Sequence, residues 1–141
     1  MTGPFNSLLY VAAGGSLGAI TRYSIGHLAL RFGLLGQMSA ITGTLAANIL
    51  GCFLMGAALA TLELKEHTIP SDELVRLKLF AITGFLGALT TFSTYGADSL
   101  YLFKTQSVKA TLLYIGGSNL LGLLGLYVAY ILTGQLIQSL R

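Results

Sequence analysis

The sequence predicts an all-α integral membrane protein with four transmembrane helices. Of the 141 residues, 54% are hydrophobic and only 9% are charged, and the mean hydropathy is +0.76. Charged residues make up about 25% of an ordinary soluble domain, so this composition excludes a soluble globular fold. The apolar residues also form four runs that are long enough to cross a bilayer, for which about 20 residues are needed. We therefore expect one four-span membrane domain over residues 1–141.

The four expected spans follow one another with short connections. They cover residues 5–30, 42–62, 74–103 and 108–136, each within a few residues. Residues 64–73 between the second and third spans contain charged side chains and a proline, which are typical of a solvated turn. An even number of spans places both termini on the same side of the membrane.

The third span is expected to break near its centre, within the stretch from Gly84 to Gly96. Glycines weaken a helix through backbone entropy, and the hydroxyl residues between Thr90 and Thr94 offer the backbone competing hydrogen bonds. Inside a membrane, non-helical backbone is tolerated only where protein buries it or where it lines a water-filled path. The break therefore points to transport.

The distribution of basic residues predicts an antiparallel assembly. Orientation in the membrane follows the asymmetry of lysine and arginine between the two sides. Here the two sides carry equal numbers: Lys65, Arg76, Lys78 and Arg141 on the side of the termini, and Arg22, Arg31, Lys104 and Lys109 on the other. A chain without this asymmetry can insert both ways, and two opposite copies could pair about an axis in the membrane plane. Small residues four apart, such as Gly14 and Gly18, predict closely packed helices.

Two classes of function are disfavoured. No carboxylate lies near the centre of a span, no histidine or cysteine cluster resembles a metal site, and no serine has a histidine partner within a span, so an enzyme is not expected. The net charge of +3 is spread thinly along the chain, which gives no basic patch for nucleic acid.

Arg22 and Asn48 are the polar residues within spans that are hardest to explain by packing. Arg22 has two interpretations: a side chain that reaches the interface and pairs with Asp98, or part of an electropositive vestibule that concentrates anions. Asn48 shares a helix face with Thr44, four residues earlier. Its amide could bond a neighbouring helix, or it could donate to an anion in a path. On the fourth span, Tyr114 and Ser118 form a sparser polar line.

The broken third span offers ligands for ions of both signs. Phe92 and Tyr95 are three residues apart and can present two rings on one face; core packing is the common reason for such a pair. Aromatic ring edges are partially positive, however, and can solvate an anion without trapping it. Opened backbone from Gly87 to Thr90 would leave carbonyl oxygens for a small hard cation.

Three motifs together resemble those of the Fluc/CrcB fluoride channels, in the same order. The first contains Gly15, Gly18, Arg22 and Tyr23; the second is Gly-Thr-Leu-x-x-Asn-x-x-Gly over 43–51; the third is Gly-Phe-x-Gly-x-x-Thr-Thr-Phe-Ser-Thr-Tyr over 84–95. The resemblance covers essentially the whole chain.

The resemblance implies passive export of fluoride through two pores in a dual-topology homodimer, with a structural sodium ion at the dimer centre. It implies lipid as the surroundings and a bacterial inner membrane as the location. By motif position, the backbone carbonyls of Gly87 and Thr90 would bind sodium. The fluoride path would include Asn48, Phe92, Tyr95, Thr44, Ser118 and Tyr114, with Ser93 and Thr94 beside the crossing and Arg22 in the vestibule.

Two positions depart from the family pattern, and one rival function stays open. Tyr95 stands where phenylalanine is common, and Gly122 stands where relatives often have a hydroxyl residue. The rival is a non-conducting membrane scaffold subunit or a small-solute exporter, in which the polar residues serve only helix packing.

Overall fold

The computed structural model describes residues 4–33 and 39–140, and all of their regular structure is helical. This confirms the predicted all-α fold. The long helices are α1 (Pro4–Arg31), α2 (Ser39–Lys65), α5 (Phe92–Thr105) and α6 (Val108–Ser139). Between α2 and α5, three shorter segments follow one another: α3 (Ser71–Leu77), the π-helical η2 (Lys78–Leu86) and α4 (Gly87–Leu89).

Three helical segments in the described part of the chain are long and apolar enough to cross a membrane. They are residues 40–65, 71–105 and 108–139, and each corresponds to an expected span. The chain is therefore an integral membrane protein. The remaining expected span corresponds to α1, which has 28 residues but is not among the three.

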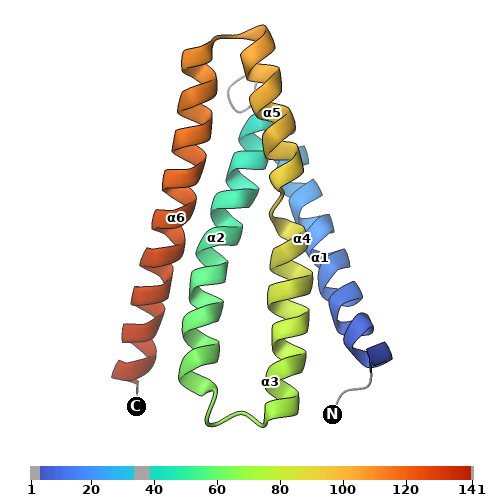
Figure 1. The fold of residues 1–141 in the computed structure, drawn as a ribbon, viewed down its shortest axis with the longest axis vertical. Coiled ribbons are helices and arrows are strands. Elements are labelled where there is room, and N and C mark those ends of the chain that lie inside the picture. The colour runs from blue at the N-terminus through green and yellow to red at the C-terminus, as the bar shows by residue number, and fades with distance from the viewer. Residues whose placement is uncertain (1–3, 34–38, 141) are drawn as a thin grey trace.

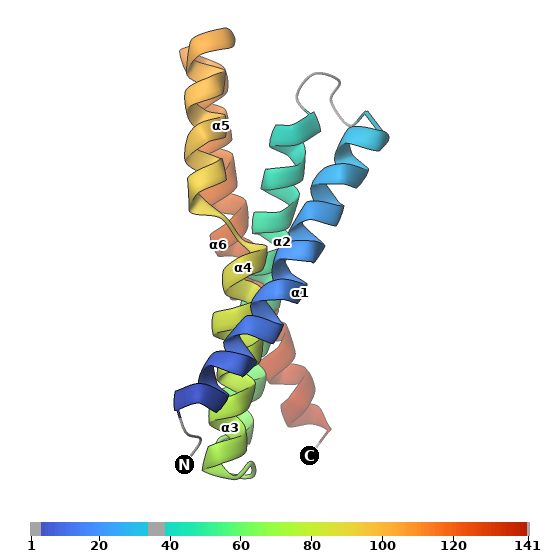
Figure 2. The same cartoon turned by 90° about the vertical axis from the view of Figure 1, so that its right-hand side faces the viewer.

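The helices run roughly along one long axis, and both ends of the chain lie at the same end of the molecule (Figure 1). The connection from α2 to α3 lies at that end, whereas the turn from α5 to α6 lies at the opposite end. The main packed pairs are α2 with α6 and α1 with η2. In the half of the molecule that is farther from the termini, α5 and α6 separate from α1 and α2 (Figure 2).

The glycines of α1 allow its backbone to touch the backbone of the third span. An added Cβ at Gly14 would lie closer than 3.0 Å to the carbonyl oxygen of Phe80, and one at Gly18 would lie as close to that of Phe85. Real Cβ atoms do not approach a carbonyl so closely. The prediction of close helix packing at Gly14 and Gly18 is confirmed, and the partner is the π-helical segment.

We expect Gly18→Ala to lower the free energy of unfolding by about 1–3 kcal/mol, because the new methyl group would force α1 away from η2. Gly15→Ala is the matched control, since its Cβ would lie 4.0 Å from the nearest atom, the carbonyl oxygen of Gly84. Chemical unfolding of both variants in detergent measures the difference. Equal stability of the two would contradict the backbone contact.

Candidate functional site

The third span is interrupted at two threonines. Thr90 and Thr91 have extended backbone, with φ/ψ of −85°/154° and −147°/119°, and helix resumes at Phe92. The sequence predicts an opening from Gly87 to Thr90; Thr90 lies in the break, but Gly87 lies within a helix. The break lies after Gly87 because polar side chains bond the backbone of the threonines. This extended backbone is allowed for threonine and does not need the conformational freedom of glycine.

Asn48 of α2 pairs with the extended backbone at Thr91. The Thr91 N–H donates to Asn48 Oδ1 at 2.8 Å, and Asn48 Nδ2 donates to the Thr91 carbonyl at 3.2 Å. Backbone groups outside a helix must find partners within the bilayer, where no water serves them. The interhelical role that sequence reasoning left open for Asn48 is therefore present in the structure. Its amide has a second N–H, and the residue also lines a cavity.

The same hydrogen bonds release two carbonyl groups. In a continuous helix, the N–H of residue 91 would bond the carbonyl of Gly87, and the N–H of residue 94 would bond that of Thr90. Here the Thr91 N–H goes to Asn48 instead, and the Thr94 N–H donates to Thr91 Oγ1 at 3.2 Å. Gly87 and Thr90, the two residues predicted to supply carbonyls, have thus lost their helical partners.

Three hydroxyl groups gather at the start of α5. Thr91 Oγ1 lies 3.2 Å from Ser93 Oγ and donates to Thr94 Oγ1 at 3.1 Å. Thr91 is the N-cap residue of α5, a position at which threonine is a favoured residue. Ser93 and Thr94 therefore lie beside the break. The structure also gives Thr91 a central role that the sequence could not distinguish from that of Thr90.

A cavity of about 370 Å³ lies between α2, the break and α6, and it joins four of the predicted path residues. These are Asn48, Phe92, Tyr95 and Ser118. The Phe92 and Tyr95 ring centroids are 5.7 Å apart, and the Phe92 side chain is 84% exposed. Among the described residues, Ser118 Oγ is the one buried side-chain oxygen or nitrogen without a hydrogen-bond partner. It therefore remains available to a ligand.

The two tyrosines of the predicted path are tied to other residues. Tyr95 OH accepts a hydrogen bond from Asn119 Nδ2 at 2.9 Å, which holds the hydroxyl against α6. The Tyr114 ring lies beside that of Tyr95, with centroids 5.6 Å apart, and its OH donates to Asp98 at 3.2 Å. Tyr114 does not line the cavity. The partner of Tyr95, Asn119, carried no specific signal in the sequence.

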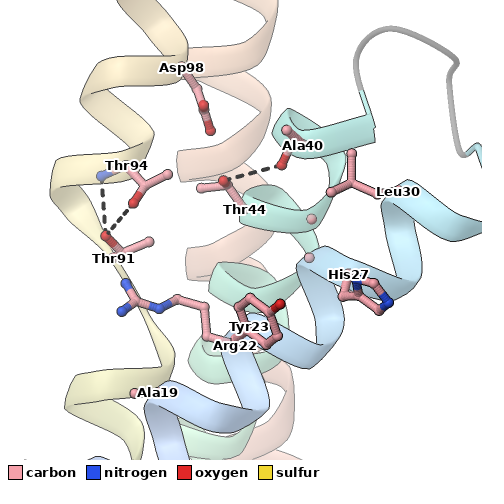
Figure 3. A pocket seen from close by; sticks show the side chains of 12 residues that line it. Ala19, Arg22, Tyr23, His27, Leu30, Ala40, Thr44, Thr91, Thr94 and Asp98 are labelled. Carbon is pink, nitrogen blue, oxygen red and sulfur yellow. Dashed lines mark hydrogen bonds between the residues drawn. The ribbon is translucent and has the colours of Figure 1, made fainter.

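A second cavity, of about 420 Å³, lies between α1, α2 and α5. Arg22, Thr44 and Thr94 line it together with Asp98, and the Arg22 side chain extends toward Thr91 (Figure 3). Among the described residues, no ion pair joins Arg22 to Asp98. Thr44 is buried, and its hydroxyl donates to the Ala40 carbonyl at 3.4 Å.

Most of the predicted site residues line one of two cavities, whereas Gly87, Ser93 and Tyr114 line neither. Thr91 lines both of them, so the break forms the boundary between the two. The cavity on one side of this boundary holds the Arg22 guanidinium together with the Asp98 carboxylate, and the cavity on the other side is lined by aromatic rings and hydroxyl groups. Among the described residues, no cluster of histidine, cysteine or carboxylate side chains could hold a metal ion.

Comparison with known proteins gives a consistent result. The family model described as CrcB-like protein, Camphor Resistance (CrcB), matches residues 9–130. A protein of Salinibacter ruber named fluoride-specific ion channel FluC is 46% identical over 116 residues, which are 82% of this chain and 80% of the relative. Proteins with the same name from Rhizobium johnstonii and Helicobacter pylori are 39% and 34% identical, and cover 89% and 92% of this chain and 90% and 94% of their own length.

We expect Asn48→Ala to lower the free energy of unfolding by about 2–4 kcal/mol, because it leaves the N–H and the carbonyl of Thr91 without partners in a buried position. Asn119→Ala is the control, since Asn119 is exposed and its loss leaves no buried backbone group unpaired. Unfolding in detergent compares the two variants. A smaller loss for Asn48→Ala than for Asn119→Ala would rule out the backbone role.

Proposed function

The chain belongs to the CrcB-like family, and from this we propose that it is a fluoride-selective channel through which fluoride leaves the cell down its electrochemical gradient. The relatives are named as ion channels, so the chain is a transport protein and not an enzyme. The observation that carries the proposal within the structure is the break at Thr90 and Thr91, which lies between an arginine-lined cavity and an aromatic one.

We propose that two copies assemble in opposite orientations and form two pores, with α1 as the fourth span. Phe92 supports this assembly, because a ring that is 84% exposed beside the break leaves one wall of a path open in a single protomer. The equal numbers of basic residues on the two sides favour insertion in both orientations. Cysteine labelling that found a single orientation in a bacterial inner membrane would contradict this arrangement.

The break presents carbonyl oxygens to a sodium ion and N–H groups to fluoride. Carbonyls at the end of α4 are partially negative, and the carbonyls of Gly87 and Thr90 lack their helical partners, which suits a sodium ion. Each copy would contribute these two carbonyls at the dimer centre. Bound sodium would hold the two breaks together by supplying positive charge between them.

The start of α5 presents partially positive groups to an anion. The N–H groups of Phe92 and Ser93 belong to the first turn of the helix and have no partner within it. The edges of the Phe92 and Tyr95 rings, the second amide N–H of Asn48 and the Ser118 hydroxyl add further donors in the same cavity. Fluoride is small and strongly hydrated, so a dense set of donors is what selection over chloride requires.

Arg22, Thr44 and Thr94 line the wider cavity and would form the vestibule. A guanidinium group in a confined opening raises the local concentration of anions through its field. Tyr114 would act from behind Tyr95, by holding the Asp98 carboxylate with its hydroxyl.

Fluoride efflux from liposomes containing the purified protein, followed with a fluoride electrode, tests the function directly. The channel proposal expects rapid fluoride release and little chloride release. The rival proposal of a non-conducting scaffold subunit or a small-solute exporter expects no release of either halide. Protein-free liposomes give the background rate.

We expect Phe92→Ile to abolish fluoride efflux, because it removes the exposed ring edge beside the break. The substitution should leave the fold intact, since Phe92 has little contact with its own protomer. Efflux and the oligomeric state in detergent are measured on the same preparation. An unchanged efflux rate would remove Phe92 from the path.

We expect Tyr95→Phe to change the fluoride efflux rate by less than about threefold, because the hydroxyl is bonded to Asn119 and the ring stays in place. Losing one exposed hydrogen bond should cost about 1 kcal/mol of stability. A large gain or loss of flux would show that the hydroxyl itself contacts the ion. Phe92→Ile in the same assay gives the scale for a full loss.

A further inference from the structure

A small polar cavity lies at the end of the molecule where both termini are found, away from the break. It has a volume of about 250 Å³ and is lined by Asn6, Leu9 and Tyr10 of α1 and by Arg76 of α3. One guanidinium, one carboxamide and one phenol therefore converge on it from two helices. All three can donate hydrogen bonds, and the guanidinium matches the geometry of a phosphate group.

The cavity lies close to the starts of α1 and α3, and from this we infer that it lies at the level of lipid headgroups. Asn6 is two residues from the start of α1, and Arg76 is five residues from the start of α3. At 1.5 Å per residue, these positions are within about 8 Å of the helix ends. Basic pockets between transmembrane helices at this level are suited to anionic headgroups. Arg76 is exposed, and its charge also interacts with the Asp72 carboxylate one helical turn earlier.

An apolar stripe continues from this cavity toward the middle of the membrane. Leu9, Ala13 and Leu17 follow one another at intervals of four residues on one face of α1, and all three are exposed. The stripe from Leu9 to Leu17 is about 12 Å long. A polar cavity at the helix end with an apolar stripe below it matches the shape of a phospholipid, whereas free phosphate would use only the cavity.

We propose that each protomer binds one anionic phospholipid here, with the lipid phosphate on Arg76, Asn6 and Tyr10 and an acyl chain along Leu9, Ala13 and Leu17. The site does not depend on which ion the protein conducts. It would fix the lipid where α1 meets the third span, the two elements that pack through Gly14 and Gly18.

Native mass spectrometry of the full chain in detergent tests the site. Purified protein is titrated with dioleoylphosphatidylglycerol or with dioleoylphosphatidylcholine, and the number of bound lipids is counted. We expect preferential retention of one phosphatidylglycerol per protomer. Equal retention of the two lipids by the wild-type protein would overturn the proposal.

Arg76→Gln should raise the apparent dissociation constant for phosphatidylglycerol about tenfold, through loss of charge-assisted hydrogen bonds. Lys78→Gln is the matched control, because it removes the same charge two residues later on a side chain that does not line the cavity. An equal rise of the dissociation constant in both variants would show that the lipid is attracted by the overall positive charge and not by a specific site. Displacement of the lipid by millimolar inorganic phosphate would show that the cavity binds free phosphate instead.

Ala13→Trp tests the acyl-chain stripe without a change of charge. The bulky ring should reduce lipid retention, whereas Ala12→Trp, on a neighbouring exposed position of another face, should not. The same spectra report the oligomeric state. If Ala13→Trp dissociates the assembly and leaves lipid retention unchanged, a second copy covers the stripe and the lipid proposal fails.

Discussion

The structure depends on how a stretch of extended backbone is satisfied inside a membrane. Two residues of the third span leave the helix, and their N–H and carbonyl groups have no water to bond. Asn48 supplies the partner for both groups of Thr91, and Thr91 in turn caps the helix that follows. The pairing of α2 with α6 and of α1 with η2 keeps this asparagine opposite the break.

The opposite polarities at the break have one origin. When the N–H groups of Thr91 and Thr94 turn to side-chain acceptors, the carbonyls of Gly87 and Thr90 are left behind, and the first N–H groups of α5 are exposed on the other side. A helix that ends and restarts within two residues therefore brings a partially negative end and a partially positive end together. A cation and an anion could both use it without a charged side chain at the centre of the span.

Much of this arrangement could be predicted from the sequence, and the exceptions have physical reasons. Hydropathy and length identified the helices, and the spacing of Gly14 and Gly18 identified a packing face. The exact position of the break could not be predicted, because it depends on where Asn48 lies relative to the third span, which is a tertiary fact. For the same reason the sequence could not show that Thr91 separates two cavities or that Asn119 binds Tyr95.

Asn48 also affects how genetic data on this protein would be interpreted. One side chain holds the break together, releases the carbonyl of Gly87 and lines the aromatic cavity. A substitution at position 48 could remove folded protein from the membrane or only prevent ion conduction. A growth screen for fluoride tolerance would record the same phenotype in both cases. Abundance and flux must therefore be scored separately at this position, whereas the exposed Phe92 permits a direct interpretation.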